Sequence, residues 1–239
     1  MTETYPEHYN AIKDVVLTDF LDTETESTFK ASEIWKDQPA IIVVIRRPGC
    51  PFCREEARIL DEHRAIIEKQ MGFRMIVVIH EKLGAATFKN QYWNGGETYW
   101  DGSKGFYKAL GGGKLRWASI DQLLRPSLWF NALRNLRSGV RGNLLVGEGR
   151  IFGGLYIVRK GDAGVAYKFE ETVMGNLAPI SEVLRVCSEI SGVDVDEASL
   201  RKAREQEKEA QERKEAAAAR GQTECEGDVC ALPPAASKL

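Results

Sequence analysis

Two cysteines separated by two residues are the feature of this sequence best suited to chemistry. Cys50 and Cys53 lie within IRRPGCPFCREEARIL, residues 45–60. Such a pair can act as a redox couple, supply half of a zinc site, or simply pack in a core. A zinc site needs two more ligands, and the other cysteines stand far along the chain, at positions 187, 225 and 230. A redox couple is therefore the preferred hypothesis, and no bound metal is expected.

The position of Cys50 favours a thiolate nucleophile. A cysteine at the first turn of a helix faces unpaired backbone N–H groups and the positive end of the helix dipole, which lowers a thiol pKa from ~8.5 into the ~3.5–7.5 range. Arg46, Arg47 and Arg54 are candidates to add positive potential near it. Cys53 would lie on the same helical turn, close enough to displace a sulfenic acid or a mixed disulfide formed on Cys50.

Three apolar runs predict the buried strands that would position this pair. They are AIIVVI (40–45), FRMIVVI (73–79) and IFGGLYIV (151–158), rich in Ile and Val and without clean alternation. Between the first two, apolar residues recur at helical spacing until Gly72, a natural stop. The result is a βαβ unit with CPFC at its turn, which is the arrangement of thioredoxins.

The remaining segments predict an α/β domain over residues 1–192, with a central mixed sheet flanked by helices. A helix is expected around residues 83–92, followed by a turn-rich stretch, 96–113. Residues 119–139 predict a helical insertion broken at Pro126. A hairpin formed by 151–158 and VAYKFEE, and an amphipathic helix over 179–192, complete the domain.

Composition changes abruptly after residue 193. Residues 193–220 are strong helix formers with almost no large apolar side chain, which predicts a charged, solvated helix. Turn formers and two prolines in residues 221–239 predict a disordered tail. Cys225 and Cys230 lie there beside Glu226 and Asp228, whose negative charge makes these thiols poor first attackers. They could relay oxidation from the CxxC pair, bind a metal, or have no role.

Overall composition excludes several classes of function. The chain has 239 residues and a formal charge of −2, which provides no basic field for a nucleic acid. Its longest apolar run is far shorter than the ~20 residues of a membrane helix, and the polar start MTETYPEHYN is no secretory signal. Five cysteines, an odd number, argue against a disulfide framework. We expect a soluble protein that is not secreted.

Two histidines and an aromatic cluster are weaker candidates for the site. His63 falls among apolar residues of the helix after CPFC and is interpreted as a core histidine. His80 ends a predicted strand and could approach the site or be structural. Trp117, Trp129 and Phe130 could line an apolar groove, although aromatic residues at helical spacing more often belong to a core.

The stretch RRPGCPFCREEA, together with FYKALG and GNLLVGEGRIFGGLYIV, resembles the peroxiredoxin-like 2 family, which includes selenoprotein U and prostamide/prostaglandin F synthase. The resemblance spans roughly residues 12–190. It implies a thioredoxin-like fold with a helical insertion, with Cys50 as the attacking residue and Cys53 as its partner. Typical peroxiredoxins have a threonine three residues before the attacking cysteine, whereas this chain has Arg47 there.

The resemblance also implies an activity. Antioxidant action and reduction of a prostaglandin endoperoxide occur in this family, and both break an O–O bond. We therefore expect a thiol-dependent oxidoreductase that reduces hydroperoxide or endoperoxide substrates, without a bound cofactor and with electrons from a thioredoxin or glutathione system. The alternative is a redox-sensing or binding module of the same fold, in which the cysteine pair is oxidised without catalytic turnover.

The last three residues predict a location. Ser237, Lys238 and Leu239 form the tripeptide that the peroxisomal import receptor reads, on a proline-containing tail. We expect a peroxisomal protein that is cytosolic before import and has this receptor as a partner. Peroxisomal oxidases release hydrogen peroxide, so a peroxide-reducing enzyme would be chemically sensible there.

Overall fold

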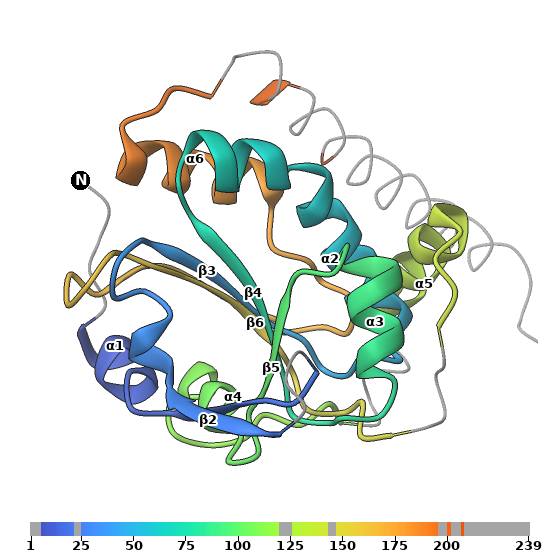
Figure 1. Ribbon diagram of the computed structural model, residues 1–239. Coiled ribbons are helices and arrows are strands. Elements are labelled where there is room, and N and C mark those ends of the chain that lie inside the picture. The colour runs from blue at the N-terminus through green and yellow to red at the C-terminus, as the bar shows by residue number, and fades with distance from the viewer. Residues whose placement is uncertain are drawn as a thin grey trace, which may run out of the picture.

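A seven-stranded mixed sheet forms the centre of the protein (Figure 1). The computed structural model describes residues 6–21, 25–119, 126–142 and 147–195, together with residues 200, 201 and 207. The strand order is β2-β1-β5-β4-β3-β6-β7. Strands β3, β4 and β5 are parallel to one another, and the strands on both sides of them pair antiparallel.

Strands and helices are interspersed along the chain. The strands are β1 Val16–Asp19, β2 Ser27–Lys30, β3 Ala40–Val44, β4 Arg74–Ile79, β5 Glu97–Trp100, β6 Gly154–Val158 and β7 Val165–Glu170. The α-helices are α1 Pro6–Ile12, α2 Pro51–Glu62, α3 Ala85–Tyr92, α4 Gly105–Leu110, α5 Pro126–Ser138 and α6 Ile180–Ser191. A 3-10 turn, η1 Ala31–Glu33, and a π-helical segment, η2 Ala65–Gln70, complete the series.

The βαβ unit expected around the cysteines is present. Strand β3 leads into α2, and β4 returns parallel to β3, with Ala40 opposite Arg74 and Val44 opposite Val78. The predicted hairpin follows as β6 and β7, with β6 antiparallel to β3, and α6 closes the unit. This βαβ–ββα order confirms the predicted thioredoxin-like α/β fold. The helix after CPFC differs in one respect: it continues beyond α2 as the π-helical η2 before it ends at Gly72, which has φ of 73°.

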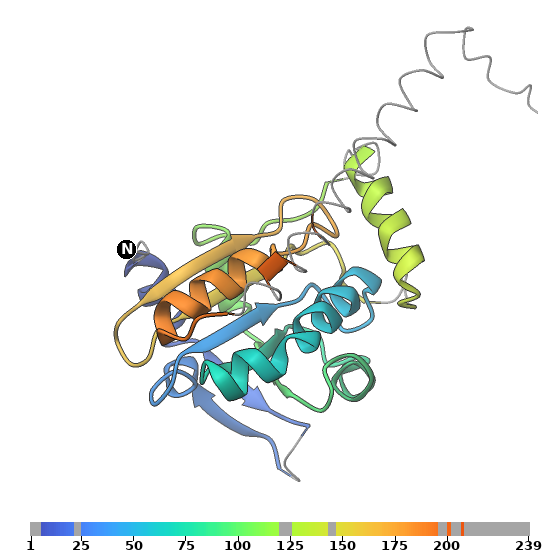
Figure 2. The same ribbon diagram turned by 90° about the horizontal axis from the view of Figure 1, so that it is seen from above.

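Each face of the sheet is covered by helices, as the continuous apolar strands predict. Ile41 and Val43 of β3 point to the face covered by α2, α3 and α6, whereas Ala40, Ile42 and Val44 point to the face covered by α1 and α4. Figure 2 shows α2 and α6 lying across the same face of the sheet. Both sides of β3 are therefore buried, and its C-terminal end carries the chain directly to the cysteine pair.

The interpretation of residues 96–113 as turns was incomplete. This stretch contains β5 and α4. Thr98 of β5 pairs with Val77 of β4, and Phe106 and Leu110 of α4 are buried against the sheet. Asp101 Oδ2 accepts a hydrogen bond from the Phe106 N–H at 2.9 Å. Strands β1 and β2 were not predicted either, because a four-residue strand carries too few residues for a clear local pattern.

The described part of the charged C-terminal segment contacts the domain. Leu200 packs against the hydrophobic cluster to which α6 contributes. Glu207 accepts hydrogen bonds from Ser181 N at 2.8 Å and from Ser181 Oγ at 2.7 Å, at the start of α6. These contacts differ from the fully solvated helix that we expected for residues 193–220. The first half of the insertion, before Pro126, and the tail 221–239 lie outside the described residues, so the domain boundaries stay predictions.

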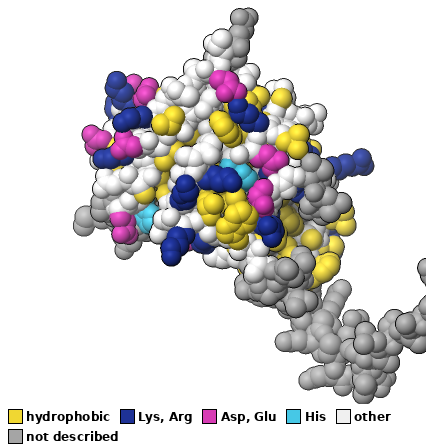
Figure 3. All heavy atoms as spheres, turned by 90° about the horizontal axis from the view of Figure 1, so that it is seen from below, with side chains coloured by type: hydrophobic (Ala, Val, Ile, Leu, Met, Phe, Trp, Pro, Cys, Tyr) yellow, Lys and Arg dark blue, Asp and Glu magenta, His cyan; other side chains and the backbone are white. Residues whose placement is uncertain are grey.

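The surface carries charges of both signs. On the face seen in Figure 3, Lys and Arg side chains are interspersed with Asp, Glu and hydrophobic side chains. Within the described residues, no helix is long and apolar enough to cross a bilayer.

Candidate active site

Cys50 sits at the junction between the sheet and α2. It is the N-cap residue of α2, with an extended backbone (φ −71°, ψ 126°), and Pro51 begins the helix. The fixed φ of proline suits the first helical turn, where its missing N–H has no partner to lose. Cys50 is only 2% exposed and Cys53 only 4%. Both thiols are free, so the structure describes the reduced pair at the positive end of the helix dipole.

Arg46 is brought directly to Cys50. Its Nη2 donates a hydrogen bond to Cys50 Sγ at 3.1 Å, and its Nη1 donates to the Gly149 carbonyl at 3.2 Å. Its Nε forms an ion pair with Glu171 Oε1 at 3.2 Å. The guanidinium also lies 5.5 Å from the centre of the Phe52 ring. The side chain is 3% exposed, so the charge acts on Cys50 with little screening by water.

The environment separates the two thiols in acidity. Burial alone would raise the pKa of Cys50, but hydrogen bonds from the Cys53 thiol and N–H, with the positive charge of Arg46, lower it to about 6. For Cys53, burial together with its hydrogen bond to Cys50 raises the pKa well above the ordinary value. At neutral pH the pair therefore consists of a Cys50 thiolate and a Cys53 thiol, which matches an attacking and a resolving residue.

The other two candidate arginines have different surroundings. Arg54 donates from Nε to the Pro48 carbonyl at 2.9 Å and from Nη1 to the Arg141 carbonyl at 2.7 Å. Its guanidinium lies 4.6 Å from the centre of the Tyr92 ring. Arg47 is buried, and a Cβ on Gly149 would come within 2.7 Å of Arg47 Nε, so glycine allows this close approach. Arg54 thus ties loops to α2, while Arg46 has the contact with the nucleophile.

Two glutamates near Arg46 were not identified from the sequence. Glu171 directly follows β7 and is buried; its carboxylate accepts hydrogen bonds from Gly153 N at 3.2 Å and Gly175 N at 2.8 Å. Glu56, on α2, has its pKa raised to about 8 by burial and by the negative charge of Glu171. The sequence could point to Glu171 only through the hairpin, because the end of β7 lies opposite the start of β6, which pairs with the end of β3. That inference requires the register of β3, β6 and β7.

The insertion helix α5 covers the N-terminal part of α2. Asn135 Nδ2 donates to the Pro51 carbonyl at 3.0 Å and to Glu55 Oε2 at 3.2 Å. Arg134 forms a bidentate pair with the same carboxylate, at 2.9 and 3.1 Å. After α5, Gly142 approaches Pro51 so closely that a Cβ there would lie 2.6 Å from Pro51 N. The insertion therefore closes over the turn that carries Cys50.

The weaker candidates have structural surroundings. His63 is buried, with Nδ1 3.0 Å from the Ile59 carbonyl, as expected of a core histidine. The His80 ring packs edge-on against Tyr107 with centroids 4.9 Å apart, and burial lowers its pKa. Cys187 of α6 is fully buried, and burial raises the pKa of its thiol. None of these groups carries a contact with Cys50 comparable to that of Arg46.

The aromatic cluster does not form part of the core. Trp117 is 47% exposed and Trp129 is 65% exposed, while Phe130 is partly buried. Trp129 shares the outer face of α5 with Leu133 and Leu136, which are also exposed. The helical spacing of apolar residues in α5 therefore marks two faces, of which only one is packed.

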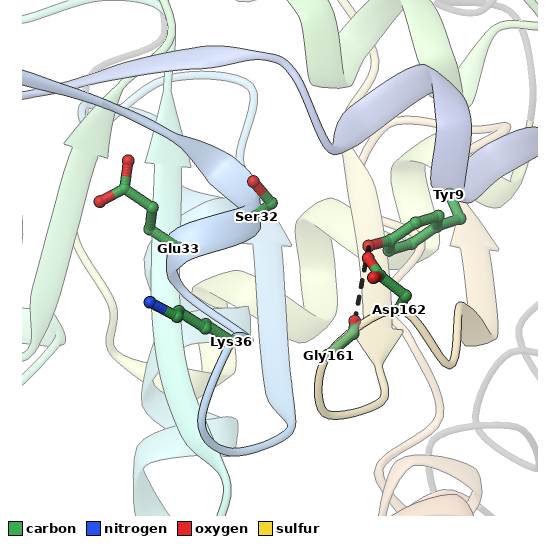
Figure 4. Close-up of a pocket in the computed structure, with 6 residues that line it drawn as sticks. All are labelled: Tyr9, Ser32, Glu33, Lys36, Gly161 and Asp162. Carbon is green, nitrogen blue, oxygen red and sulfur yellow. Dashed lines mark hydrogen bonds between the residues drawn. The ribbon is translucent and has the colours of Figure 1, made fainter.

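A shallow pocket lies on the opposite side of the sheet from the cysteines. It is lined by Tyr9, Ser32, Glu33, Lys36, Gly161 and Asp162 (Figure 4). The Tyr9 hydroxyl donates to Asp162 Oδ1 at 2.5 Å, which ties α1 to the turn between β6 and β7. No predicted site residue lines this pocket. Within the described ranges, no three His, Cys, Asp or Glu side chains gather as a metal site.

The remaining predicted site residues cannot be placed. Cys225, Cys230, Ser237, Lys238 and Leu239 lie outside the described residues. Their proposed roles in relay and targeting stay predictions from sequence.

Comparison with known proteins gives a consistent family. The model of the AhpC/TSA antioxidant enzyme family matches residues 60–173, a range that begins after the cysteine pair and includes Glu171. Peroxiredoxin-like 2A of Gallus gallus is 34% identical over 163 residues, covering 68% of this chain and 70% of that protein. Peroxiredoxin-like 2A of Homo sapiens is 33% identical over 163 residues, with 68% and 69% covered.

Solved structures with a similar course of the chain include peroxiredoxins. Peroxidoxin BcpB from Mycobacterium tuberculosis matches with a TM-score of 0.48 and 10% identity, covering 82% of this chain and 99% of that one. Oxidized Prx3 from Vibrio vulnificus matches with a TM-score of 0.48 and 14% identity, covering 77% and 97%. The strand order supports the fold, and the sequence relatives show the family.

Proposed function

The chain belongs to the peroxiredoxin-like 2 family, and from this premise we propose that it is a thiol-dependent oxidoreductase that reduces hydroperoxides or endoperoxides through Cys50 and Cys53. The family supports a redox role. The observation that carries the finer proposal is the Arg46 Nη2 to Cys50 Sγ hydrogen bond, because it holds a buried sulfur as a thiolate beside a protonated partner thiol.

The first step uses the thiolate. Cys50 Sγ attacks one oxygen of the O–O bond, an S–O bond forms, and the O–O electron pair leaves with the other oxygen, which takes up a proton. For a hydroperoxide the products are the Cys50 sulfenic acid and an alcohol or water. Arg46 can stabilise the negative charge that moves from sulfur to the leaving oxygen.

The second step uses the neighbouring thiol. Cys53 lies one helical turn from Cys50, and its sulfur displaces the sulfenic oxygen as water, which leaves a Cys50–Cys53 disulfide. An external dithiol of the thioredoxin type, or glutathione, then supplies two electrons and two protons to restore both thiols. No bound cofactor is required for this cycle.

A peroxide turnover assay tests the proposal. The reduced full-length chain would be supplied with hydrogen peroxide or an organic hydroperoxide and, in parallel, with a thioredoxin or a glutathione recycling system, beside Cys50→Ser and Cys53→Ser variants. We expect repeated turnover that is lost in Cys50→Ser, whereas Cys53→Ser should stop at the sulfenic acid unless another thiol resolves it. A single oxidation of each molecule, without cycling under either reductant, would instead favour the redox-sensing module.

The last three residues support a second proposal, about the location of the protein. We propose that Ser237-Lys238-Leu239 direct the protein to peroxisomes through the import receptor, where peroxide is produced. A fluorescent protein fused in front of the chain should appear in peroxisomes, and removal of these three residues should leave it in the cytosol. Continued import without them would refute the proposal.

A further inference from the structure

We propose that Glu171 is a positioning residue for the thiol chemistry of Cys50, acting through the guanidinium of Arg46 that it holds in place. The inference rests on the proposed role of Cys50 as the nucleophile. It adds a residue from the far end of the hairpin, with no contact of its own to the sulfur, to the machinery of the CPFC turn.

The geometry fixes both ends of this connection. Glu171 Oε1 forms the ion pair with Arg46 Nε at 3.2 Å, while Arg46 Nη2 donates to Cys50 Sγ at 3.1 Å. The Arg46 side chain has several rotatable bonds, so without these partners it would sample many orientations. The carboxylate at Nε, the sulfur at Nη2 and the Gly149 carbonyl at Nη1 together select a single orientation. All three side chains are nearly inaccessible to water.

The carboxylate is itself held rigidly. Gly153 N and Gly175 N donate to its two oxygens at 3.2 and 2.8 Å, and Glu171 N donates to the Gly153 carbonyl at 3.1 Å. Gly175 has φ of 79°, and a Cβ there would meet Phe52 at 2.8 Å. The backbone around Glu171 is thus built to place a carboxylate beneath Arg46, since a buried carboxylate without these partners would be unfavourable.

A purely structural ion pair would have a different electrostatic effect. Glu171 is negatively charged near Cys50 and by its charge alone raises the thiol pKa. A glutamate that merely neutralised Arg46 would therefore make Cys50 less reactive. Positioning has the opposite effect, because the contact of Arg46 with the sulfur lowers the same pKa. Removing Glu171 should therefore lower the Cys50 pKa if Glu171 acts only through its charge. It should raise that pKa if Glu171 positions Arg46.

The titratable and charged groups around Cys50 come from three elements. Arg46 follows β3, Cys53 and Glu56 belong to α2, and Glu171 follows β7. Neighbouring Glu170 instead pairs with Arg116 at 3.3 Å and with Lys168 at 2.5 Å. Glu170 therefore provides a matched control, with the same side chain one position earlier in the chain.

The experiment measures the pH dependence of Cys50 alkylation. The reduced full-length protein is treated with iodoacetamide between pH 4 and pH 9, and the Cys50 peptide is quantified by mass spectrometry. This readout needs no peroxide and no reductase, so it stays informative if the proposed turnover fails. In Glu171→Gln we expect the Cys50 pKa to rise, with alkylation at pH 5 at least about tenfold slower than in wild type. In Glu170→Gln the profile should be unchanged.

Two further variants keep the test decisive. Glu171→Asp retains the charge but shortens the reach to Arg46, so the Cys50 pKa should rise there too. This variant replaces Glu171→Gln in the test if circular dichroism shows that Glu171→Gln is unfolded. When Arg46 is already replaced, in Arg46→Gln, adding Glu171→Gln should produce no further rise. An unchanged or lowered Cys50 pKa in folded Glu171→Gln or Glu171→Asp would overturn the proposal.

Discussion

Asn135 on the insertion helix α5 donates a hydrogen bond to the carbonyl of Pro51, the residue next to Cys50 in the chain, at 3.0 Å. Asn135 is 6% exposed, and its amide also reaches Glu55. The insertion and the nucleophile turn are thus tied by a buried polar contact. A substrate or a reductant must reach a sulfur that is almost inaccessible, so this contact has consequences for access to Cys50.

Replacing Asn135 by Ala should make Cys50 more accessible. Loss of a buried hydrogen bond costs about 1–3 kcal/mol, and local opening of α5 should become more frequent by the corresponding factor, roughly 5- to 150-fold. We expect faster labelling of Cys50 by a maleimide at pH 7. Leu136→Ala is the matched control, because Leu136 is on the exposed face of the same helix. Equal labelling in Asn135→Ala and wild type would show that α5 does not limit access.

The stability of the reduced protein should depend on pH through Cys50. Its pKa is about 6 in the folded chain, below its ordinary value of about 9. Above pH 9 the thiol is ionised in both the folded and the unfolded chain, and its full contribution to the unfolding free energy is present. This contribution is lost as the pH falls through 6. The difference in unfolding free energy between wild type and Cys50→Ser should therefore grow from pH 6 to pH 9, by at most on the order of 4 kcal/mol.

Denaturant titrations under reducing conditions measure this difference. Cys187→Ala is the control, since that thiol is neutral in both the folded and the unfolded chain over most of this range. A difference that shrinks with rising pH would contradict a Cys50 thiolate.

Cys187 should be chemically inert in the folded protein. It is fully buried in α6, and burial raises the pKa of its thiol. We expect Ellman's reagent to react with Cys50 in the native protein and with Cys187 only after denaturation. Cys187→Ala should keep peroxide turnover within about twofold of wild type and lose about 1 kcal/mol of stability at most. Loss of turnover in this variant would assign Cys187 a role in the redox cycle.

Tyr107→Phe should destabilise the strand ends that lead to the site. The buried Tyr107 hydroxyl is 2.7 Å from the Ile45 carbonyl and 3.3 Å from the Val78 carbonyl, at the ends of β3 and β4. Leaving these carbonyls without the donor should cost about 1–3 kcal/mol in unfolding free energy. Tyr92→Phe is the control, because the Tyr92 hydroxyl lies near the surface; its cost should be about 0.5 kcal/mol or less. Equal costs would mean that the bond beside Ile45 is unimportant.

Much of the site could be predicted from sequence because its signals are local. Runs of Ile and Val define β3 and β4, and Pro51 after Cys50 marks the start of α2. Together these features predict a CxxC pair at a helix N-terminus, with Cys50 first. The family followed from the motif at this turn together with two stretches farther along the chain. Short-range geometry is sufficient here, since every residue involved lies within about one helical turn of the next.

Tertiary structure decided which charges act on Cys50. Three arginines near the pair are equivalent in the sequence, but the path of the chain after β3 brings Arg46 to the sulfur and sends Arg54 to the carbonyls of Pro48 and Arg141. Glu171 meets Arg46 only because β6 pairs with β3 and β7 pairs with β6. The pairing of β6 with the distant β3, with a register set by which faces are buried and by the hairpin turn, places residues 46 and 171 side by side. The same reason hid β5, whose pairing partners β1 and β4 are distant in the chain.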